Sequence, residues 1–255
     1  MRITFLGTGT SQGVPVIACH CKVCSSSNPR DKHLRCSSLV ETNEGKNILI
    51  DIGPDFREQM LRHKVEHLDS ILITHAHRDH VGGIDDIRSF NYVQNKAMDL
   101  YGNSQALKTI RNDYHYIFEH HEFPGLPEAV MHEIDGSSPF IAAHIEVVPV
   151  KAMHKTLPVL GYRLDRFGYL TDCNYIEKTE LEKLKGVDVL AIGALRKEKH
   201  FSHFCLSEAL QVIEEIHPRS AYIIHVSHQM GLYDQIESEL PDHVHMAYDG
   251  LKIEI

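Results

Sequence analysis

The chain has 255 residues, of which 42% are apolar, and a formal net charge of −9. This length fits one large domain, or two halves around one core, and the composition excludes a disordered chain. An acidic surface is a poor partner for DNA or long RNA, although bound divalent ions can reverse the field around a small anionic substrate.

Signals for membrane insertion or export are not evident in the hydropathy pattern. No run of residues approaches the roughly 18–20 consecutive apolar positions that span a bilayer. The first seven residues, MRITFLG, predict a strand that runs into a glycine turn, without the apolar segment and cleavage site of a signal peptide. We therefore expect a soluble cytoplasmic protein with no membrane partner.

Short apolar runs and helical spacings alternate along the first half of the chain. The run at 48–51 predicts a strand, and Asp55 is placed to cap a helix on which Phe56 and Met60 share one face. A second buried run at 70–73 leads directly into Thr74. Helical spacing then recurs at Ile84, Ile87 and Asn91, and again at Leu107, Ile110, Tyr114 and Ile117.

The second half repeats this style. Leu206, Leu210 and Ile213 share a helical spacing, and Asp249-Gly250 predicts the turn of a hairpin between strands at 244–248 and 251–255. Further strands are expected at 145–150, 159–164, 169–171, 187–192 and 221–224, with a tight turn at 165–168.

The stretch from 91 to 138 is the least regular part of the chain, and it is rich in Tyr, Phe, His and Pro. One interpretation is a lid or an inserted arm over a functional site. The other is an ordinary helix with surface loops. The residue pattern leaves both open.

A dense group of metal-ligating side chains follows the predicted strand at 70–73. Residues 74–80 read T-H-A-H-R-D-H, with His75, His77, Asp79 and His80 within six positions. A turn here can direct the first two one way and the last two another, which suits two cations about 3.5–4 Å apart. Imidazole and carboxylate ligands favour zinc, manganese or iron over calcium. A solvated polar loop explains a lone H-x-H, but poorly explains this pattern at a strand end.

A second metal-ligating group is the cluster Cys19, Cys21 and Cys24. In a cytosolic chain such clustering indicates metal before disulfides. Three thiolates need a fourth ligand to close a tetrahedral zinc site, and three reduced thiols without a metal are the alternative. The other cysteines, Cys36, Cys173 and Cys205, are expected to be ordinary core residues.

The H-x-H-x-D-H pattern resembles the hallmark of the metallo-β-lactamase superfamily. Residues 5–9, FLGTG, resemble its opening strand and turn, and residues 49–53, LIDIG, resemble a marker in which Asp51 braces the metal loop. The resemblance implies a single domain over residues 1–255 with an α+β four-layer αββα sandwich. It implies one ion held by His75, His77 and His154, and another held by Asp79, His80 and His225, with Asp172 bridging the two.

A narrower resemblance points to the PhnP-type phosphodiesterases, accessory enzymes of carbon–phosphorus bond metabolism. It is carried by GTGTSQGVP at 7–15, by the cysteine cluster and by HVSHQ at 225–229. By this resemblance His228 completes a structural zinc site with the three cysteines and ties the N-terminal loop to the loop of His225. The region 91–144 matches no subgroup, and the resemblance alone does not place the chain in phosphonate metabolism.

The same resemblance implies a substrate-facing histidine ahead of the predicted helix at 206. His203 takes this place, where it would protonate the leaving oxygen or stabilise phosphoryl charge, and His200 is a close competitor. Asp79 and Asp172 would orient a hydroxide activated by the two ions.

These features together predict a hydrolase that acts on a small anionic phosphodiester, open-chain or cyclic, with two divalent ions of zinc or manganese and one structural zinc. A ribonuclease Z-like function would need a basic docking arm, and the sequence shows none. Thioester or lactone hydrolysis uses the same metal ligands and stays open, whereas the complete ligand set argues against a non-catalytic scaffold. The sequence leaves open whether the chain acts alone or as a homodimer.

Overall fold

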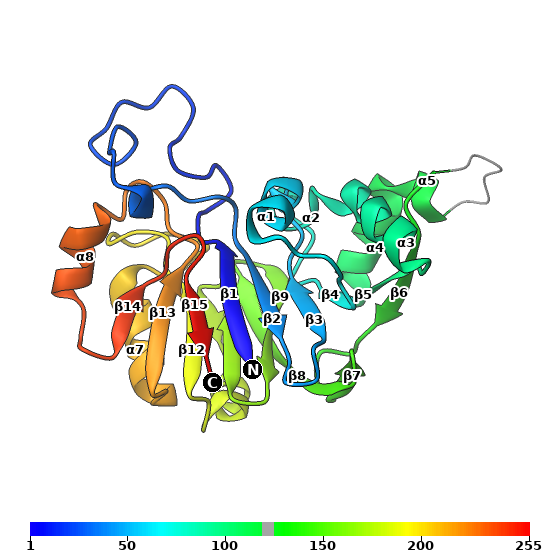
Figure 1. Ribbon diagram of the computed structural model, residues 1–255. Coiled ribbons are helices and arrows are strands. Elements are labelled where there is room, and N and C mark those ends of the chain that lie inside the picture. Colours follow the sequence, from blue (N-terminus) through cyan, green and yellow to red (C-terminus); the bar gives the residue numbers. More distant parts are fainter. Residues whose placement is uncertain (119–124) are drawn as a thin grey trace.

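Two β-sheets face each other and carry helices on their outer faces (Figure 1) in the computed structural model, which describes residues 1–118 and 125–255. This layer order confirms the predicted αββα sandwich. The N- and C-termini lie at one end of the strands, and the long loop between β1 and β2 extends from the opposite end.

The first sheet has the strand order β15-β1-β2-β3-β4-β5-β6. Pairing is antiparallel from β15 to β3 and parallel from β3 to β6. Its strands are β1 (Arg2–Gly7), β2 (Ser37–Glu41), β3 (Asn47–Ile50), β4 (Ser70–Leu72), β5 (Met98–Gly102), β6 (Ala129–Glu133) and β15 (Lys252–Glu254).

The second sheet has the order β11-β8-β9-β10-β12-β13-β14, with β7 beside β8. Here β8, β9 and β10 pair antiparallel, and β10, β12, β13 and β14 pair parallel. Its strands are β7 (Phe140–Ala142), β8 (Ile145–His154), β9 (Leu157–Leu164), β10 (Phe167–Leu170), β11 (Tyr175–Ile176), β12 (Val189–Gly193), β13 (Ser220–Ile224) and β14 (Val244–Met246).

Helices cover both outer faces, and among the described residues none is long and apolar enough to cross a membrane. The first sheet carries α1 (Phe56–His63), α2 (Arg78–Val81), η2 (Ile84–Ile87), α3 (Arg88–Gln94), α4 (Ser104–Asp113) and α5 (His115–Phe118). The second carries α6 (Lys178–Leu181), η3 (Glu182–Leu184), α7 (Leu206–Ile216) and α8 (Tyr233–Glu239), while η1 (Pro29–Asp31) lies in the loop after β1.

Alternating side chains explain why both faces of the sheets are covered. On β3, Ile48 and Ile50 point into the layer between the sheets, whereas Leu49 points outward to the layer under α1 and α4. Successive residues of a strand face opposite sides, so a run with no polar position requires cover on both. A third apolar layer joins α7 to the second sheet through Ile213 and Leu190.

The predicted hairpin around Asp249-Gly250 is wrong. β14 pairs with β13 in the second sheet, and β15 pairs with β1 in the first, so the chain crosses between the sheets at this turn. Asp249 is drawn inward, where its carboxylate accepts hydrogen bonds from the N–H and hydroxyl of Thr8 and the N–H of Leu34. Asp249-Gly250 does form a turn, as the sequence predicts. The same residue pair fits a hairpin between paired strands and a turn that connects strands of two different sheets.

Two further expectations change in the structure. Asp55 stands at the N-cap of α1 without a side-chain capping bond, and its carboxylate instead binds the backbone N–H and the guanidinium of Arg35. The described part of 91–138 forms α3, β5, α4, α5 and β6, which complete one side of the first sheet. Residues 119–124 of that stretch lie outside the described residues.

Candidate metal centre

Strands of both sheets end in candidate metal ligands or their supporting residues at the same end of the sandwich. Asp51 follows β3 directly, His75 follows β4, Asp172 follows β10, and His225 follows β13. Parallel strands end at one edge, and their carboxyl ends are where α/β sheets present functional groups. Asp51, Asp172 and His225 each adopt a positive φ, of 61°, 44° and 56°, so the chain turns sharply at these residues.

Hydrogen bonds to Asp51 fix the loop 74–80 in place. Its carboxylate accepts hydrogen bonds from the Thr74 N–H and hydroxyl, both at 2.8 Å, and from His80 Nδ1 at 2.7 Å. Gly53 lets the loop pack closely, since a Cβ at this position would lie 2.2 Å from the carbonyl oxygen of Asp79. Asp51 therefore braces the metal loop, as the resemblance implied.

Asp79, His80, Asp172 and His225 form one group of converging ligand atoms. Asp172 Oδ1 lies 3.2 Å from His80 Nε2 and 3.0 Å from His225 Nε2, and Asp79 Oδ2 lies 3.2 and 3.6 Å from the same nitrogens. Ligand atoms about 2.0–2.1 Å from one tetrahedral ion would lie about 3.3 Å apart. The spacing fits a divalent ion.

His75, His77 and His154 gather on the other side of Asp172. His75 Nε2 lies 3.0 Å from His77 Nδ1 and 3.9 Å from Asp172 Oδ2. The His77 and His154 ring centroids are 5.2 Å apart. His154 Nδ1 donates to the Ser202 carbonyl oxygen at 2.7 Å, which leaves its Nε2 as the ligating nitrogen.

Buried nitrogens that face carboxylates without forming hydrogen bonds are the strongest sign that cations belong in this cluster. His80 Nε2 and His225 Nε2 are buried and lie close to Asp172 and Asp79, but among the described residues no contact to these nitrogens has hydrogen-bond geometry. Burial by itself lowers the pKa of His80, but Asp172, Asp79 and Asp51 outweigh it and raise that pKa well above the ordinary value. Carboxylates likewise raise the pKa of His225 to about 9 against the effect of burial. The site therefore favours positive charge, and its donors suit zinc or manganese.

His203 and His200 differ clearly in position. The ring of His203 stacks on His225 with centroids 5.1 Å apart, and its Nδ1 lies 3.8 Å from Asp172 Oδ2. The ligand atoms of His203 also come within 4.8 Å of those of His154 and Asp172. Burial and the neighbouring histidines lower the pKa of His203 to about 3, so the ring is neutral and donates one N–H. His200 lies behind it, with its ring centroid 5.2 Å from that of His203.

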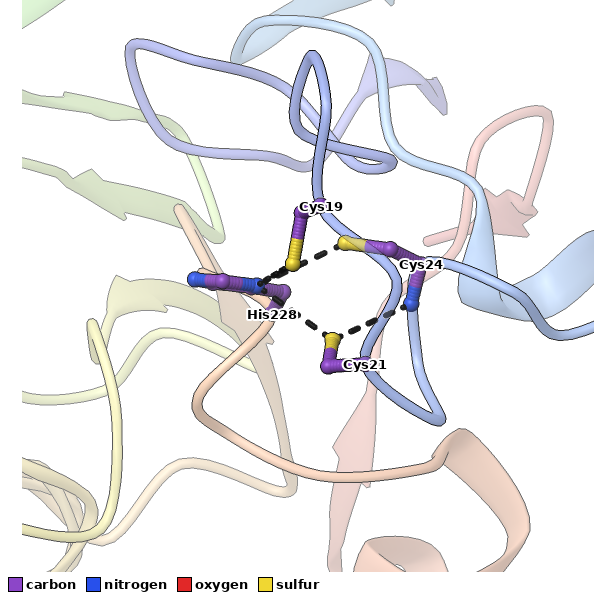
Figure 2. A group of neighbouring side chains, drawn as sticks. All are labelled: Cys19, Cys21, Cys24 and His228. Carbon is purple, nitrogen blue, oxygen red and sulfur yellow. Dashed lines mark hydrogen bonds between the residues drawn. The ribbon is translucent and has the colours of Figure 1, made fainter.

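The structure brings the three clustered cysteines together with His228. Figure 2 shows Cys19, Cys21 and Cys24 around His228, whose Nδ1 lies 3.3, 3.4 and 3.4 Å from their sulfur atoms. Zinc–ligand distances of about 2.3 and 2.0–2.1 Å imply a sulfur–nitrogen separation of about 3.5 Å at a tetrahedral ion. The Val16 N–H donates to Cys24 Sγ, and the Cys24 N–H donates to Cys21 Sγ. The hydrogen bond from Cys24 lowers the pKa of the Cys21 thiol to about 6, whereas burial raises the pKa of the Cys24 thiol to about 11.

The two clusters share one loop. His228 lies three residues beyond His225, and backbone hydrogen bonds join Val226 to Thr8 and Thr10. The N-terminal loop is thereby held against the loop that presents His225. Cys36, Cys173 and Cys205 lie apart from the cluster and are buried, as expected of core residues.

Asp249 and Thr74 are supporting residues that the sequence analysis missed. Asp249 accepts a hydrogen bond from the Thr8 hydroxyl and so holds the turn after β1. The Thr74 hydroxyl donates to Asp51 and lies 3.0 Å from His75 Nδ1, so it links Asp51 to His75. Neither residue belongs to a ligand motif. The position of Thr74 directly before the first histidine was the only available signal.

Comparisons with known proteins agree on one family. A family model described as a beta-lactamase superfamily domain matches residues 46–226. A solved structure described as a new diphosphatase from the PhnP family is 35% identical, with a TM-score of 0.92, over 100% of this chain and 97% of that chain. Zn(2+)-bound PqqB from Methylobacterium extorquens, 15% identical over 100% of each chain with a TM-score of 0.83, shares the fold.

A curated relative is longer than this chain. A protein named octanoyltransferase, from Porphyromonas gingivalis (strain ATCC BAA-308 / W83), is 40% identical over 253 residues, which are 99% of this chain and 51% of that protein. The chain thus spans about half the length of this relative. On the family model and the full-length structural match, the chain belongs to the beta-lactamase superfamily, in its PhnP-type branch.

Proposed function

We propose that the chain hydrolyses phosphodiesters at a centre of two divalent metal ions. The observation that carries this proposal is the position of Asp172, whose Oδ1 faces His80 and His225 while its Oδ2 faces His75. A carboxylate with one oxygen toward each ligand group is suited to bridge two ions. One ion would be held by His75, His77 and His154, the other by Asp79, His80 and His225, and both by Asp172.

The side chains of the centre have distinct roles in this reaction. The ions, when bound, lower the pKa of water and polarise phosphoryl oxygens. Asp79 and Asp172 orient the attacking water through their carboxylates, and Asp51 keeps the His80 proton on Nδ1, so that Nε2 faces the cluster. His203 is placed beside Asp172 to donate a hydrogen bond to the departing oxygen.

The full-length relative of known structure supports phosphoryl rather than acyl chemistry. That protein is described as a diphosphatase, and its 35% identity extends over the whole of this chain. The net charge of −9 disfavours DNA or long RNA, so we propose a small anionic substrate that meets positive charge at the centre.

We also propose a structural zinc at Cys19, Cys21, Cys24 and His228. The four ligand atoms lie within 4.8 Å of one another, and they join two loops that are distant in sequence. A closed thiolate site of this kind contributes folding free energy and offers no open position for substrate.

A second candidate function is hydrolysis of a thioester. The curated relative at 40% identity is named for octanoyl transfer, which is acyl rather than phosphoryl chemistry. A hollow of about 400 Å³ has apolar lining residues that include Met153, Val159 and Leu160, and would accept an acyl chain.

A substrate panel separates these two functions. The protein is loaded with zinc or with manganese and assayed on cyclic and open-chain phosphodiesters, diphosphate diesters, acyl thioesters and lactones. We expect phosphodiester hydrolysis that Asp172→Ala abolishes and Asp242→Ala, at an exposed position, preserves. Hydrolysis of thioesters alone would contradict the first proposal and support the second.

A further inference from the structure

The three clustered cysteines differ in their access to solvent. Cys21 is exposed, Cys19 is partly buried and Cys24 is buried. Only 1–2% of the surface is accessible in the cysteines of the core, Cys36, Cys173 and Cys205. Oxidation of a cysteine requires a sulfur that the oxidant can reach. An oxidant that arrives from solvent therefore meets Cys21 first, and the core shields its own cysteines.

Cys21 and Cys24 are arranged as a pair that can form a disulfide. Their spacing is C-x-x-C, the spacing of many reversible redox pairs. The Cys24 N–H donates to Cys21 Sγ at 3.4 Å (Figure 2), and the ligand atoms of the whole cluster lie within 4.8 Å of one another. A bond between Cys19 and Cys21 would instead close a ring over a single intervening residue. Cys24 is thus the partner for Cys21.

The segment that carries the cysteines has little apolar support of its own. Its apolar cluster comprises three buried residues, Val14, Val23 and Cys24, far fewer than any of the three apolar layers of the sandwich. His228 connects the cysteines to the loop that presents His225. An ion at such a site supplies folding free energy. Its loss would loosen the N-terminal loop from the loop of His225.

We propose that Cys21 and Cys24 form a redox site, at which a peroxide makes a disulfide, expels the structural zinc and loosens the loop of His225. The Cys21 thiolate attacks hydrogen peroxide, an S–O bond forms, the O–O bond breaks, and hydroxide leaves. The Cys24 thiolate then attacks the Cys21 sulfur, an S–S bond forms, and the S–O bond breaks with loss of a second hydroxide. The two sulfurs lose two electrons, and the peroxide gains them.

The change is reversible. After oxidation Cys19 and His228 remain as two ligands, too few for a closed tetrahedral zinc site. A dithiol reductant exchanges with the disulfide, returns both thiolates and restores the four ligands. This inference rests on the proposed structural zinc, and it is independent of the substrate that the strand-end centre hydrolyses.

Zinc release from zinc-loaded protein is the first test. A small excess of hydrogen peroxide is added, and released zinc is measured with a chromogenic chelator. Asp172→Ala is measured beside the wild type, because loss of the bridging carboxylate removes the strand-end ions as a second source of zinc. We expect about one zinc per chain from both proteins, rebound after addition of a dithiol. No release, or release only when Cys36, Cys173 and Cys205 are also oxidised, would overturn the redox site.

Peptide mapping identifies the bonded pair. Trypsin cuts after Lys22, so Cys19 and Cys21 lie in the peptide 3–22 and Cys24 lies in the peptide 23–30. After free thiols are alkylated, the expected disulfide joins these two peptides, and fragmentation should place it at Cys21. A disulfide within the peptide 3–22, a disulfide at Cys19, or sulfonic acid without any disulfide would overturn the assigned pair.

Cys21→His is the matched variant. Histidine is a zinc ligand, so the variant keeps four ligands while it loses the thiol that the oxidant meets first. Its zinc should withstand peroxide, whereas Cys205→Ser should release zinc as the wild type does. Zinc loss from Cys21→His at the wild-type rate would overturn the role of Cys21. If this variant is isolated without zinc, the peptide map of the wild type decides the pair.

Hydrogen exchange tests the link to the metal centre without an activity assay. The Val226 N–H donates to the Thr8 carbonyl oxygen, and this amide should exchange faster after oxidation and recover after reduction. Unchanged exchange would overturn the link to the loop of His225. Wild-type protein purified without zinc at the cysteines would overturn the structural zinc proposed above, and the peptide map would then still decide whether the disulfide forms.

Discussion

His80 Nδ1 lies 2.7 Å from Asp51 Oδ2, and both side chains are fully buried. The carboxylate also accepts two hydrogen bonds from Thr74, so all three groups that face it in these bonds are donors. The proton of the imidazole is thereby held on Nδ1. The ligating nitrogen of His80 faces the cluster because a residue from the neighbouring strand dictates its tautomer.

Asp51→Asn should lower the affinity for the ion at His80 by about 10- to 100-fold. An amide nitrogen in place of Oδ2 would donate to His80 Nδ1, which moves the ring proton to Nε2, where it opposes a cation. Competition with a chromogenic chelator measures the dissociation constants. Unchanged affinity in a folded Asp51→Asn protein would show that the tautomer is set by something else.

Cys24→Ser should remove about one zinc ion per chain and lower Tm by about 5–10 °C, with a much smaller effect on kcat. Cys24 belongs to the cluster around His228, which supports the loop of His225 without touching substrate. Elemental analysis and calorimetry provide the readouts. Cys205→Ser is the matched control, since Cys205 is buried at the N-cap of α7, where Ser is also accepted, and it should keep its metal. A Cys24→Ser protein with full metal content would contradict the structural site.

His203→Ala should retain the metal ions and lose about 10²–10⁴-fold in turnover on a poor leaving group. The loss should shrink for a p-nitrophenyl diester, whose leaving group needs little help from a donor. Turnover on both substrates and the metal content of the variant test this together. Loss of an ion would instead assign His203 as a ligand, a role that its approach to His154 and Asp172 also allows.

Asp249→Asn should lower the free energy of unfolding by about 1–3 kcal/mol. The buried carboxylate faces donors on every side, since Oδ1 accepts from Thr8 and Oδ2 accepts from the Leu34 N–H at 2.7 Å. An amide would set a donor against one of these donors. Denaturant unfolding of the variant measures the loss, with Asp165→Asn at an exposed turn as the control. Equal stability of Asp249→Asn and wild type would show that the turn does not depend on this carboxylate.

Local sequence patterns were sufficient to predict the parts of the fold and the site that lie within one short segment. The strand ahead of His75, the ligands in 75–80 and the cysteine cluster were all visible in the sequence, because a turn or a strand end places neighbours together. The grouping of His154 and Asp172 with that loop came from resemblance, since nothing local connects β8 and β10 to β4.

Interactions across the sandwich could not be predicted from the sequence. Asp249 was expected in a hairpin, and only the pairing of β14 and β15 with different sheets reveals why it is buried. The pairing of Asp55 with Arg35 likewise depends on how two loops from separate strands approach each other. Such contacts arise from tertiary packing, for which spacing along the chain carries no signal.

The metal content of protein purified without chelator tests the account most directly. We predict about three divalent ions per chain, two at the strand-end cluster and one at the cysteines, falling to about one in Asp172→Ala because the bridging carboxylate serves both catalytic ions. A wild-type protein with about one ion, unchanged by Asp172→Ala, would contradict the dinuclear centre and the hydrolytic mechanism built on it.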